Sequence, residues 1–174
     1  LIEDLLSLSR IEMRQHVRPT APVELNALVR EVSEGLQKQA VDSGTRLALT
    51  VPDEALIVSG DRDELYEVFE NLIENAIKYG GEGGDIEIVL GPATSRQRFC
   101  AAFTVTDHGP GVAAEHVPRL TERFYRVDAE SSRKKKGTGL GLAIVKHIVT
   151  RHHGLLSIKS QPGQGTRVEV LLRK

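Results

Sequence analysis

Several features that would define the class of a protein are scarce or missing in this chain. It contains a single cysteine, Cys100, which excludes an internal disulfide and is typical of a reducing compartment. Because residues 99–105 around it are mostly apolar, we expect a buried structural thiol rather than a reactive one. The net charge of −1 argues against a nucleic-acid interface spread over the whole surface. No apolar run reaches the roughly 18 residues of a membrane span.

The start of the chain lacks both an initiator methionine and the basic opening of a signal peptide, since Glu3 and Asp4 are acidic. We therefore expect a piece of a longer protein. Its 174 residues suffice for one compact domain and an appendage.

The first 16 residues have the pattern of a helix that is too short to be stable alone in water. This helix could fold back on its own domain, or it could belong to a helical hairpin whose other half is missing. Residues 18–22 contain two prolines and resemble an extended linker, which favours the hairpin. The expected organisation is a hairpin helix over residues 1–17, a linker over 18–22 and a domain over 23–174.

The rest of the chain alternates between helical and strand-like apolar patterns. Helices are predicted over residues 23–42, 61–79 and 140–153. Strands are predicted over residues 46–51, 56–58, 85–90, 99–106, 155–160 and 166–172. Asp61 should cap the second helix, with Glu64 reaching back to it. Helices mixed with hairpin-linked strands indicate an α+β two-layer sandwich rather than a parallel βαβ array.

Asn71, Asn75 and Lys78 share one side of the second predicted helix, roughly opposite its apolar stripe. An asparagine carbonyl is a hard oxygen ligand that Mg²⁺ accepts alongside phosphates and water, and a lysine supplies a point charge for phosphate. A solvated polar face explains the same three residues equally well, because asparagine is only mildly unfavourable inside a helix.

Asp107 follows a strand-like stretch, and the chain then turns through Gly109 and Gly111. A carboxylate in this place can accept a hydrogen bond from the exocyclic amine of adenine. The glycines allow the backbone to approach the base closely. Standing alone, the pattern is more often an ordinary turn at the end of a strand.

A second glycine-rich stretch, residues 137–143, leads directly into the third predicted helix, where backbone N–H groups and the helix dipole favour a phosphate. A lysine-rich loop precedes it, whereas a dinucleotide fingerprint needs a strand there, and the spacing also differs from a phosphate loop. Residues 112–136 lack periodicity, which is typical of an active-site lid. Lys134, Lys135 and Lys136 in this loop either contact phosphates or form a solvated segment.

Together and in this order, the motifs resemble the catalytic ATP-binding domain of bacterial sensor histidine kinases. Residues 71–76 are similar to the N box of that family, 107–111 to its first glycine box, 122–128 to its F box, 137–146 to its second glycine box and 163–166 to its closing glycine–threonine turn. The resemblance covers about residues 23–174. It implies the Bergerat ATP-binding fold shared with gyrase, Hsp90 and MutL, in which a mixed, mostly antiparallel sheet packs on helices and ATP lies under a mobile lid.

The resemblance also implies roles for individual residues. Asn75, with Asn71 beside it, would bind Mg²⁺, and Asp107 would bind the adenine amine of ATP. The backbone around that amine would come from Gly109 and Gly111.

At the other end of the nucleotide, Lys78 and Tyr79 would meet phosphate or ribose, Phe124 would anchor the lid and Arg126 would approach the γ-phosphate. Asn71, Lys78 and Arg126 would act in catalysis by positioning and charge neutralisation. The remaining nucleotide contacts implied by the family are Gly137, Thr138, Gly139, Leu140, Gly141, Leu142 and Thr166.

In such a kinase the γ-phosphoryl group passes to a histidine of the dimerising hairpin and then to an aspartate of a response regulator. The expected acceptor box is absent, because His16 in the opening helix lacks an acidic neighbour and a following Thr-Pro. We therefore interpret residues 1–17 as the tail of the second hairpin helix and expect ATP binding without transfer within this chain. His152 and His153 are adjacent on a helix, so we expect surface positions rather than a metal site.

The partners implied by the resemblance are the hairpin of the parent protein and a response regulator receiver domain. The parent would be a homodimer anchored in the bacterial inner membrane, with this domain in the cytoplasm and in contact with neither membrane nor nucleic acid. Two other functions fit the motifs: an ATP sensor that only binds, and another ATPase of the same fold, such as a serine kinase. The intact Asn75 and Asp107 argue against the first, and Phe124 with the opening helix argues against the second.

Overall fold

The computed structural model describes residues 1–14, 16–81, 84–93, 99–127 and 137–174. Apolar residues at helical spacing form α1 (Ile2–Arg14), α2 (Leu25–Asp42), α3 (Arg62–Tyr79) and α5 (Gly141–Arg151), and η1 (Val117–Arg119) is a short 3-10 helix. The strands are β1 (Ala21–Glu24), β2 (Arg46–Thr50), β3 (Ile57–Gly60), β4 (Asp85–Pro92), β5 (Ala101–Asp107), β6 (Leu155–Ser160) and β7 (Thr166–Leu172). In this described part of the chain, none of the helices is long and apolar enough to cross a membrane.

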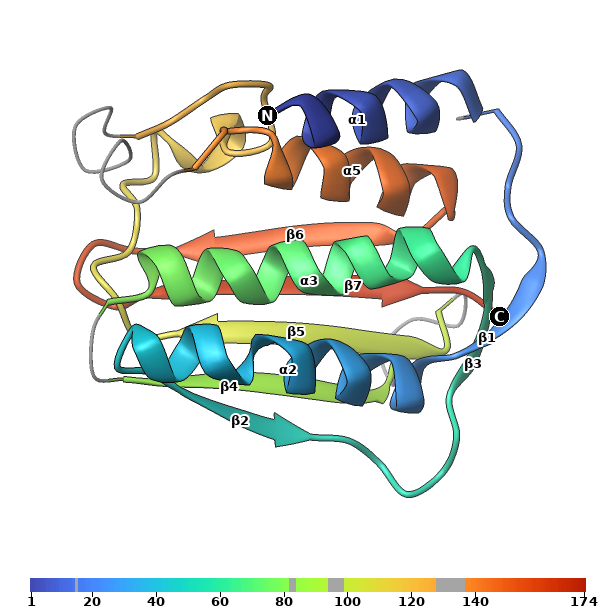
Figure 1. Ribbon diagram of the computed structural model, residues 1–174, viewed down its shortest axis with the longest axis horizontal. Coiled ribbons are helices and arrows are strands. Elements are labelled where there is room, and N and C mark those ends of the chain that lie inside the picture. Colours follow the sequence, from blue (N-terminus) through green and yellow to red (C-terminus); the bar gives the residue numbers. More distant parts are fainter. Residues whose placement is uncertain (15, 82–83, 94–98, 128–136) are drawn as a thin grey trace.

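The main sheet has five strands in the order β2-β4-β5-β7-β6. β2 runs parallel to β4, and the other neighbours are antiparallel. The last strand in sequence, β7, lies between β5 and β6, and its first residue, Thr166, is paired with Asp107 at the end of β5. The register therefore brings the end of β5 and the turn between β6 and β7 to one corner of the sheet, as Figure 1 shows.

Three helices, α2, α3 and α5, lie side by side over one face of this sheet (Figure 1). Their apolar stripes face the strands, and the rings of Phe69 on α3 and Phe103 on β5 have centroids 4.3 Å apart. Burying a side chain of this size stabilises a fold by about 2 kcal/mol, so the shared apolar layer holds helices and sheet together. The predicted two-layer α+β sandwich with a mixed, mostly antiparallel sheet is confirmed.

The opening helix, α1, continues the helical row by packing against α5 (Figure 1). Leu8 and Ile11 are buried in this contact. The helix is thus folded back on its own domain, one of the two arrangements considered from the sequence. A second group of apolar side chains on α1 faces solvent, formed by Ile2, Leu5, Leu6 and Met13, and Leu1 just before the helix is exposed as well.

The beginning of the domain differs from the prediction by two residues. Val23 and Glu24 belong to β1, which pairs antiparallel with β3, so α2 begins at Leu25 and not at residue 23. The expected extended linker likewise runs into this strand at Ala21. Pairing with β3, a contact distant in sequence, decides the conformation here.

Of the two capping interactions predicted at the N-terminus of α3, one is present and the other is absent. The Asp61 side chain accepts a hydrogen bond from the Glu64 backbone N–H (3.1 Å), as expected. The Glu64 carboxylate instead pairs with Arg151 of α5, and the Asp61 backbone N–H donates to Nε2 of His152 (3.0 Å). His152 is therefore buried, and its predicted surface position is wrong, whereas His153 is exposed.

Cys100 is half-buried, less so than predicted, with Sγ close to the carbonyl oxygens of Ile57 and Leu172. Burial raises the pKa of this thiol, which disfavours the reactive thiolate. The prediction of an unreactive structural cysteine agrees with this environment.

Candidate functional site

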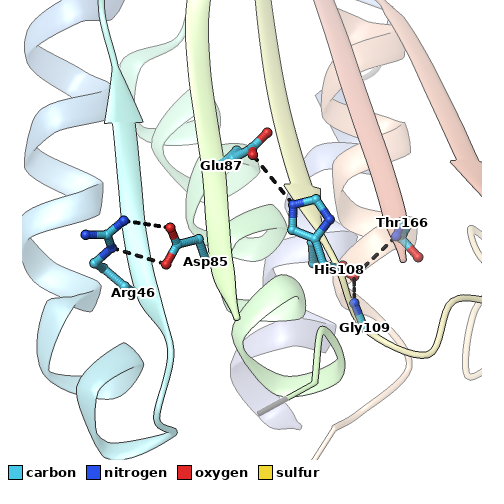
Figure 2. A network of polar contacts seen from close by, with 7 residues as sticks. Arg46, Asp85, Glu87, His108, Gly109 and Thr166 are labelled. Carbon is cyan, nitrogen blue, oxygen red and sulfur yellow. Dashed lines mark hydrogen bonds and ion pairs between the residues drawn. The ribbon is translucent and has the colours of Figure 1, made fainter. Parts of the chain in front are cut away.

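The central residue of the candidate site is Asp107, at the end of β5. Its side chain is buried, and Oδ1 accepts hydrogen bonds from the backbone N–H groups of Gly109 (3.0 Å) and Thr166 (3.2 Å), drawn in Figure 2. Within the described ranges, Oδ2 accepts no hydrogen bond from the protein, so it is available to a ligand donor. Burial raises the pKa of this carboxyl above its ordinary value, and the two backbone hydrogen bonds oppose that rise.

Glycines allow three segments to close around Asp107. A Cβ at Gly80, the C-cap of α3, would lie 2.7 Å from the Asp107 Cβ. A Cβ at Gly109 would collide with the backbone of Gly80, and one at Gly165 would collide with the backbone oxygen of Asp107. The end of α3, the end of β5 and the turn before β7 therefore meet with no room for side chains. The sequence indicated Gly109, whereas Gly80 had no predicted role in the site and Gly165 appeared only as part of the closing glycine–threonine turn.

The first glycine turn is also fixed to the turn between β6 and β7. Gly111 has a φ of 68°, and a Cβ there would collide with the backbone oxygen of Gln161. The Gly163 N–H donates to the carbonyl of Pro110 (2.7 Å). Ser160, at the end of β6, accepts a hydrogen bond from the Val112 N–H (2.8 Å). Sequence reasoning missed Ser160, because nothing in its local pattern signals a contact with residue 112.

A hollow of about 190 Å³ opens beside Asp107 and Thr166, at the ends of β5, β6 and β7. A larger hollow of about 340 Å³ lies between η1, α5 and β6, but none of the predicted site residues lines it. We assign the Asp107 end of the site to the smaller hollow, because buried acceptors and close backbone contacts give it chemical specificity and volume alone does not.

The face of the sheet away from the helices carries exposed ion pairs next to this corner (Figure 2). Arg46 binds Asp85 through Nε (3.1 Å) and Nη2 (2.6 Å), and His108 Nε2 lies 3.5 Å from Glu87. His108 points toward Glu87 and does not line the hollow, although it lies between Asp107 and Gly109 in sequence. Exposed pairs of this kind contribute little to stability.

Asn71 and Asn75 lie half-buried on α3, under the beginning of α5. A Cβ at Gly141 would lie 3.4 Å from Oδ1 of Asn71 and 3.8 Å from Oδ1 of Asn75. The two amide oxygens therefore converge on one place at the N-terminus of α5, which a fully solvated polar face would not require. Lys78, one turn further along α3, lies 4.0 Å from the Glu74 carboxylate.

The second glycine stretch lies over the end of α3. A Cβ at Gly137 would collide with the Tyr79 hydroxyl and would lie 3.2 Å from Nη2 of Arg126. These three residues, all predicted to meet the ribose or the phosphates, are thus neighbours. The Leu140 side chain is fully buried, so only its backbone can meet a ligand, and Leu142 is half-buried.

The backbone of Phe124, within the predicted lid, contacts Gly139, which follows the lid in sequence. The Phe124 N–H donates to the Gly139 carbonyl (2.9 Å), and a Cβ at Gly139 would lie 2.9 Å from the Phe124 Cα. The Phe124 side chain is 56% exposed, so the contact is made by its backbone rather than by burial of its ring. Lys134, Lys135 and Lys136 lie outside the described residues, as does Asp128 of the F-box-like stretch.

Two contacts join α1 to Thr138 of the second glycine stretch and to Arg123 of the F-box-like stretch. The Thr138 hydroxyl donates to Oδ2 of Asp4 (2.8 Å), and Arg123 forms an ion pair with Glu12. One predicted nucleotide-binding residue, Thr138, is therefore in contact with the appendage as well as with the domain.

The donor set fits the groups that the sequence motifs imply. Among the described residues, no cluster of three or more His, Cys, Asp or Glu side chains could hold a metal ion. The converging amide oxygens of Asn71 and Asn75 suit Mg²⁺, which binds few protein ligands and completes its shell with phosphates and water. The open oxygen of Asp107 suits the amine of a base, and the N-terminus of α5 suits a phosphate.

Comparison with known proteins identifies the family. The sequence pattern of the histidine kinase-, DNA gyrase B- and HSP90-like ATPases matches residues 60–174, and the chain belongs to that family. Within it, the chain resembles the catalytic ATP-binding domains of sensor histidine kinases, as its motifs predicted.

Two curated relatives illustrate this similarity. The phosphate regulon sensor protein PhoR of Pseudomonas aeruginosa is 39% identical over 166 residues, covering 95% of this chain and 36% of the relative. The sensor histidine kinase RppB of Synechocystis is 37% identical over 172 residues, covering 99% of this chain and 37% of the relative. The chain thus spans little more than a third of the length of these relatives.

Solved structures agree with the fold. Full-length ShkA in complex with AMPPNP superposes with a TM-score of 0.80 at 27% identity, covering 99% of this chain and 35% of that chain. The catalytic domain of the histidine kinase ThkA superposes with a TM-score of 0.74 at 25% identity, covering 89% of this chain and 95% of that one. The predicted Bergerat fold is confirmed.

Proposed function

We propose that this domain binds Mg-ATP and donates the γ-phosphoryl group to a histidine on the helical hairpin of its parent protein, for relay to an aspartate of a response regulator. The observation that carries the proposal is the buried Asp107 carboxylate, with one oxygen fixed by two backbone N–H groups and the other available. An adenine amine supplies the donor that this oxygen lacks, whereas guanine has a carbonyl oxygen at the same position. A buried acceptor discriminates strongly between these two groups.

The phosphate groups lie, in this proposal, between α3 and the start of α5. The backbone N–H groups at the N-terminus of α5 attract negative charge. Lys78 and Arg126 offset the charge that develops during transfer, and Tyr79 contacts the ribose or phosphate beside Gly137. Asn71 and Asn75 would hold Mg²⁺, which when bound neutralises charge on the phosphate oxygens.

The phosphoacceptor belongs to another part of the parent protein, because this chain contains no acceptor box. The exposed apolar face of α1, which includes Ile2, Leu6 and Met13, suits packing in a helical hairpin and a homodimer. The proposed parent is a membrane-anchored sensor kinase whose cytoplasmic partner is a response regulator receiver domain. The names of PhoR, a sensor protein, and RppB, a sensor histidine kinase, support a sensor kinase as the parent.

Calorimetric titration with AMPPNP and Mg²⁺ tests the binding step. The wild-type chain should bind, and Asp107→Asn should lower the affinity about 10- to 100-fold, because a buried charged acceptor is replaced by an amide. Asp85→Asn is the matched control, since Asp85 is an exposed carboxylate on the neighbouring strand β4, and its affinity should stay at the wild-type value. Equal binding by the wild type and Asp107→Asn would contradict the proposal.

Transfer is tested separately with radiolabelled ATP and a purified hairpin domain of a sensor kinase relative. The expected product is an acid-labile, base-stable phosphohistidine on the hairpin. Nucleotide binding without any such product, even with the hairpin of the parent itself, would identify a domain that only senses ATP.

A further inference from the structure

Ser160 lies at the last position of β6, where its hydroxyl contacts three residues in two segments of the site. It accepts a hydrogen bond from the Val112 N–H (2.8 Å) and donates one to the Gly165 carbonyl (3.0 Å). Its Oγ also lies 2.8 Å from Oγ1 of Thr166.

These contacts use the whole hydrogen-bonding capacity of the hydroxyl. A serine side chain has one proton and two lone pairs. Because the Gly165 carbonyl can only accept and the Val112 N–H can only donate, the arrangement that satisfies all three contacts has Thr166 donate its hydroxyl proton to Ser160. No capacity is left for a ligand, which makes Ser160 a positioning residue and not a binding residue.

Two partners of Ser160, Gly165 and Thr166, contact Asp107, and the third, Val112, lies at the end of the glycine turn that follows Asp107 in sequence. Thr166 donates its backbone N–H to Asp107, and Gly165 packs against the Asp107 backbone. Val112 follows Gly111, which packs against the turn between β6 and β7. One hydroxyl therefore connects the first glycine turn to the strand that holds the Asp107 carboxylate.

The same bonds set the direction of the Thr166 hydroxyl. Because Thr166 donates its proton to Ser160, the remaining lone pairs of Oγ1 can only accept hydrogen bonds. Thr166 Oγ1 and Asp107 Oδ2 then act as two hydrogen-bond acceptors at the same end of the site. Both favour a base that carries a hydrogen-bond donor, such as an amine.

We propose that Ser160 positions the adenine-reading groups, and that it sets the preference of the site for a 6-amino over a 6-oxo purine. The inference rests on the proposed function, because it assigns a role within the same nucleotide site. Without the Ser160 hydroxyl, Thr166 is free to turn and donate its proton to a carbonyl oxygen, so discrimination falls.

The test measures the dissociation constants of ATP and of inosine triphosphate, whose base carries a carbonyl in place of the amine, with Mg²⁺ by calorimetry. Ser160→Ala should weaken ATP binding about tenfold, with a smaller loss for inosine triphosphate. The ratio of the two constants should thus move toward unity by about threefold or more. Ser160→Thr retains a hydroxyl and should restore the wild-type ratio.

Ser157→Ala is the matched control, because Ser157 lies on the same strand but on its opposite face, paired with Glu169. It should change neither constant. If Ser160→Ala does not fold, Ser160→Cys gives the same comparison, since a thiol keeps the bulk and forms weaker hydrogen bonds.

The outcomes separate the two proposals. If the wild-type chain binds neither nucleotide, the proposed function fails and the inference with it. If the wild type prefers ATP and the Ser160 variants weaken both nucleotides equally, with an unchanged ratio, Ser160 is merely structural and this inference alone is overturned.

Discussion

The base-facing end and the phosphate-facing end of the proposed nucleotide site are built in different ways. At the base end, Asp107 is buried, and Gly80, Gly109 and Gly165 bring backbone against backbone around it. At the phosphate end, the Phe124 side chain is 56% exposed, and Thr138 bonds to a side chain of the appendage helix.

This difference indicates that the base-facing end is held more rigidly than the phosphate-facing end. Elements that belong to the sheet and the helical layer fix the acceptors for the base, so this end is preorganised before a ligand arrives. The segments near the phosphates also pack closely at Gly137 and Gly139, but they add side-chain contacts with α1, which can be replaced at a lower cost in free energy. Substitutions should therefore be far more damaging at the base end.

The largest effect is expected from Gly165→Ala. The new Cβ would collide with the Asp107 backbone at a φ of 77°, so AMPPNP binding should be lost and the melting temperature should fall by several degrees. Gly163→Ala is the control, because Gly163 has a φ of 78° in the same turn but nothing within 4 Å of a Cβ. The control should cost only the roughly 1 kcal/mol of left-handed backbone strain and should keep nucleotide binding.

Asn75→Ala examines the other end. We expect AMPPNP affinity in Mg²⁺ to fall about 10- to 30-fold, because one of the two converging amide oxygens is removed. In the presence of EDTA, wild type and variant should bind alike, which makes the metal-free titration the internal control. An equal loss with and without Mg²⁺ would mean that Asn75 supports the fold or the nucleotide directly.

A fall in pH should lower the stability of the fold through His152, which lies outside both ends of the proposed nucleotide site. This imidazole donates from Nδ1 to the Ile148 carbonyl (2.8 Å) and accepts the Asp61 N–H at Nε2, which requires the neutral form. Burial lowers the pKa of His152 below its ordinary value of 6.5, with Arg151 and Arg18 acting in the same direction and the Ile148 carbonyl and Asp61 opposing it.

The unfolded chain therefore takes up a proton near pH 6.5 that the folded chain binds only at lower pH. This contribution to stability should be complete above the unfolded value and should be lost as the pH falls through the lower pKa of the folded chain. Urea unfolding of His152→Gln should show a flatter pH dependence than wild type. His153→Gln, the exposed neighbour, should retain the wild-type slope, to which the lowered pKa of His147 also contributes.

The smallest effect is expected from Asp4→Asn. It weakens the hydrogen bond from Thr138, and we expect less than a threefold change in AMPPNP affinity, because this contact lies at the adjustable end of the site. Glu3→Gln, at an exposed neighbouring position, controls for the loss of one negative charge. An affinity loss as large as the one expected for Asp107→Asn would contradict the difference between the two ends.

Local patterns predicted much of this molecule. The apolar stripe of α3 gave its position and its Asn71–Asn75 face, and strand alternation gave β6 and β7 to the residue, because these signals depend on neighbours in sequence. Asp107 was predicted as a site residue from its place after a strand and before two glycines, and its carboxylate accepts two backbone hydrogen bonds there.

The features that were not predicted depend on contacts between distant segments. His152 is buried because the Asp61 N–H, 91 residues away, donates to it, and α2 starts late because β1 pairs with β3. Ser160 and Gly165 have no local signal for their roles, since their partners Val112 and Asp107 belong to another part of the chain. Residue spacing cannot specify such tertiary contacts.

The position of β7 between β5 and β6 has a consequence for how the molecule folds. Asp107 and Thr166 are 59 residues apart, so the pocket corner closes only when this final strand inserts between two partners. Closing such long loops is slow compared with helix formation. The refolding chain should therefore become able to bind nucleotide only in one of its last steps, after the helices have formed.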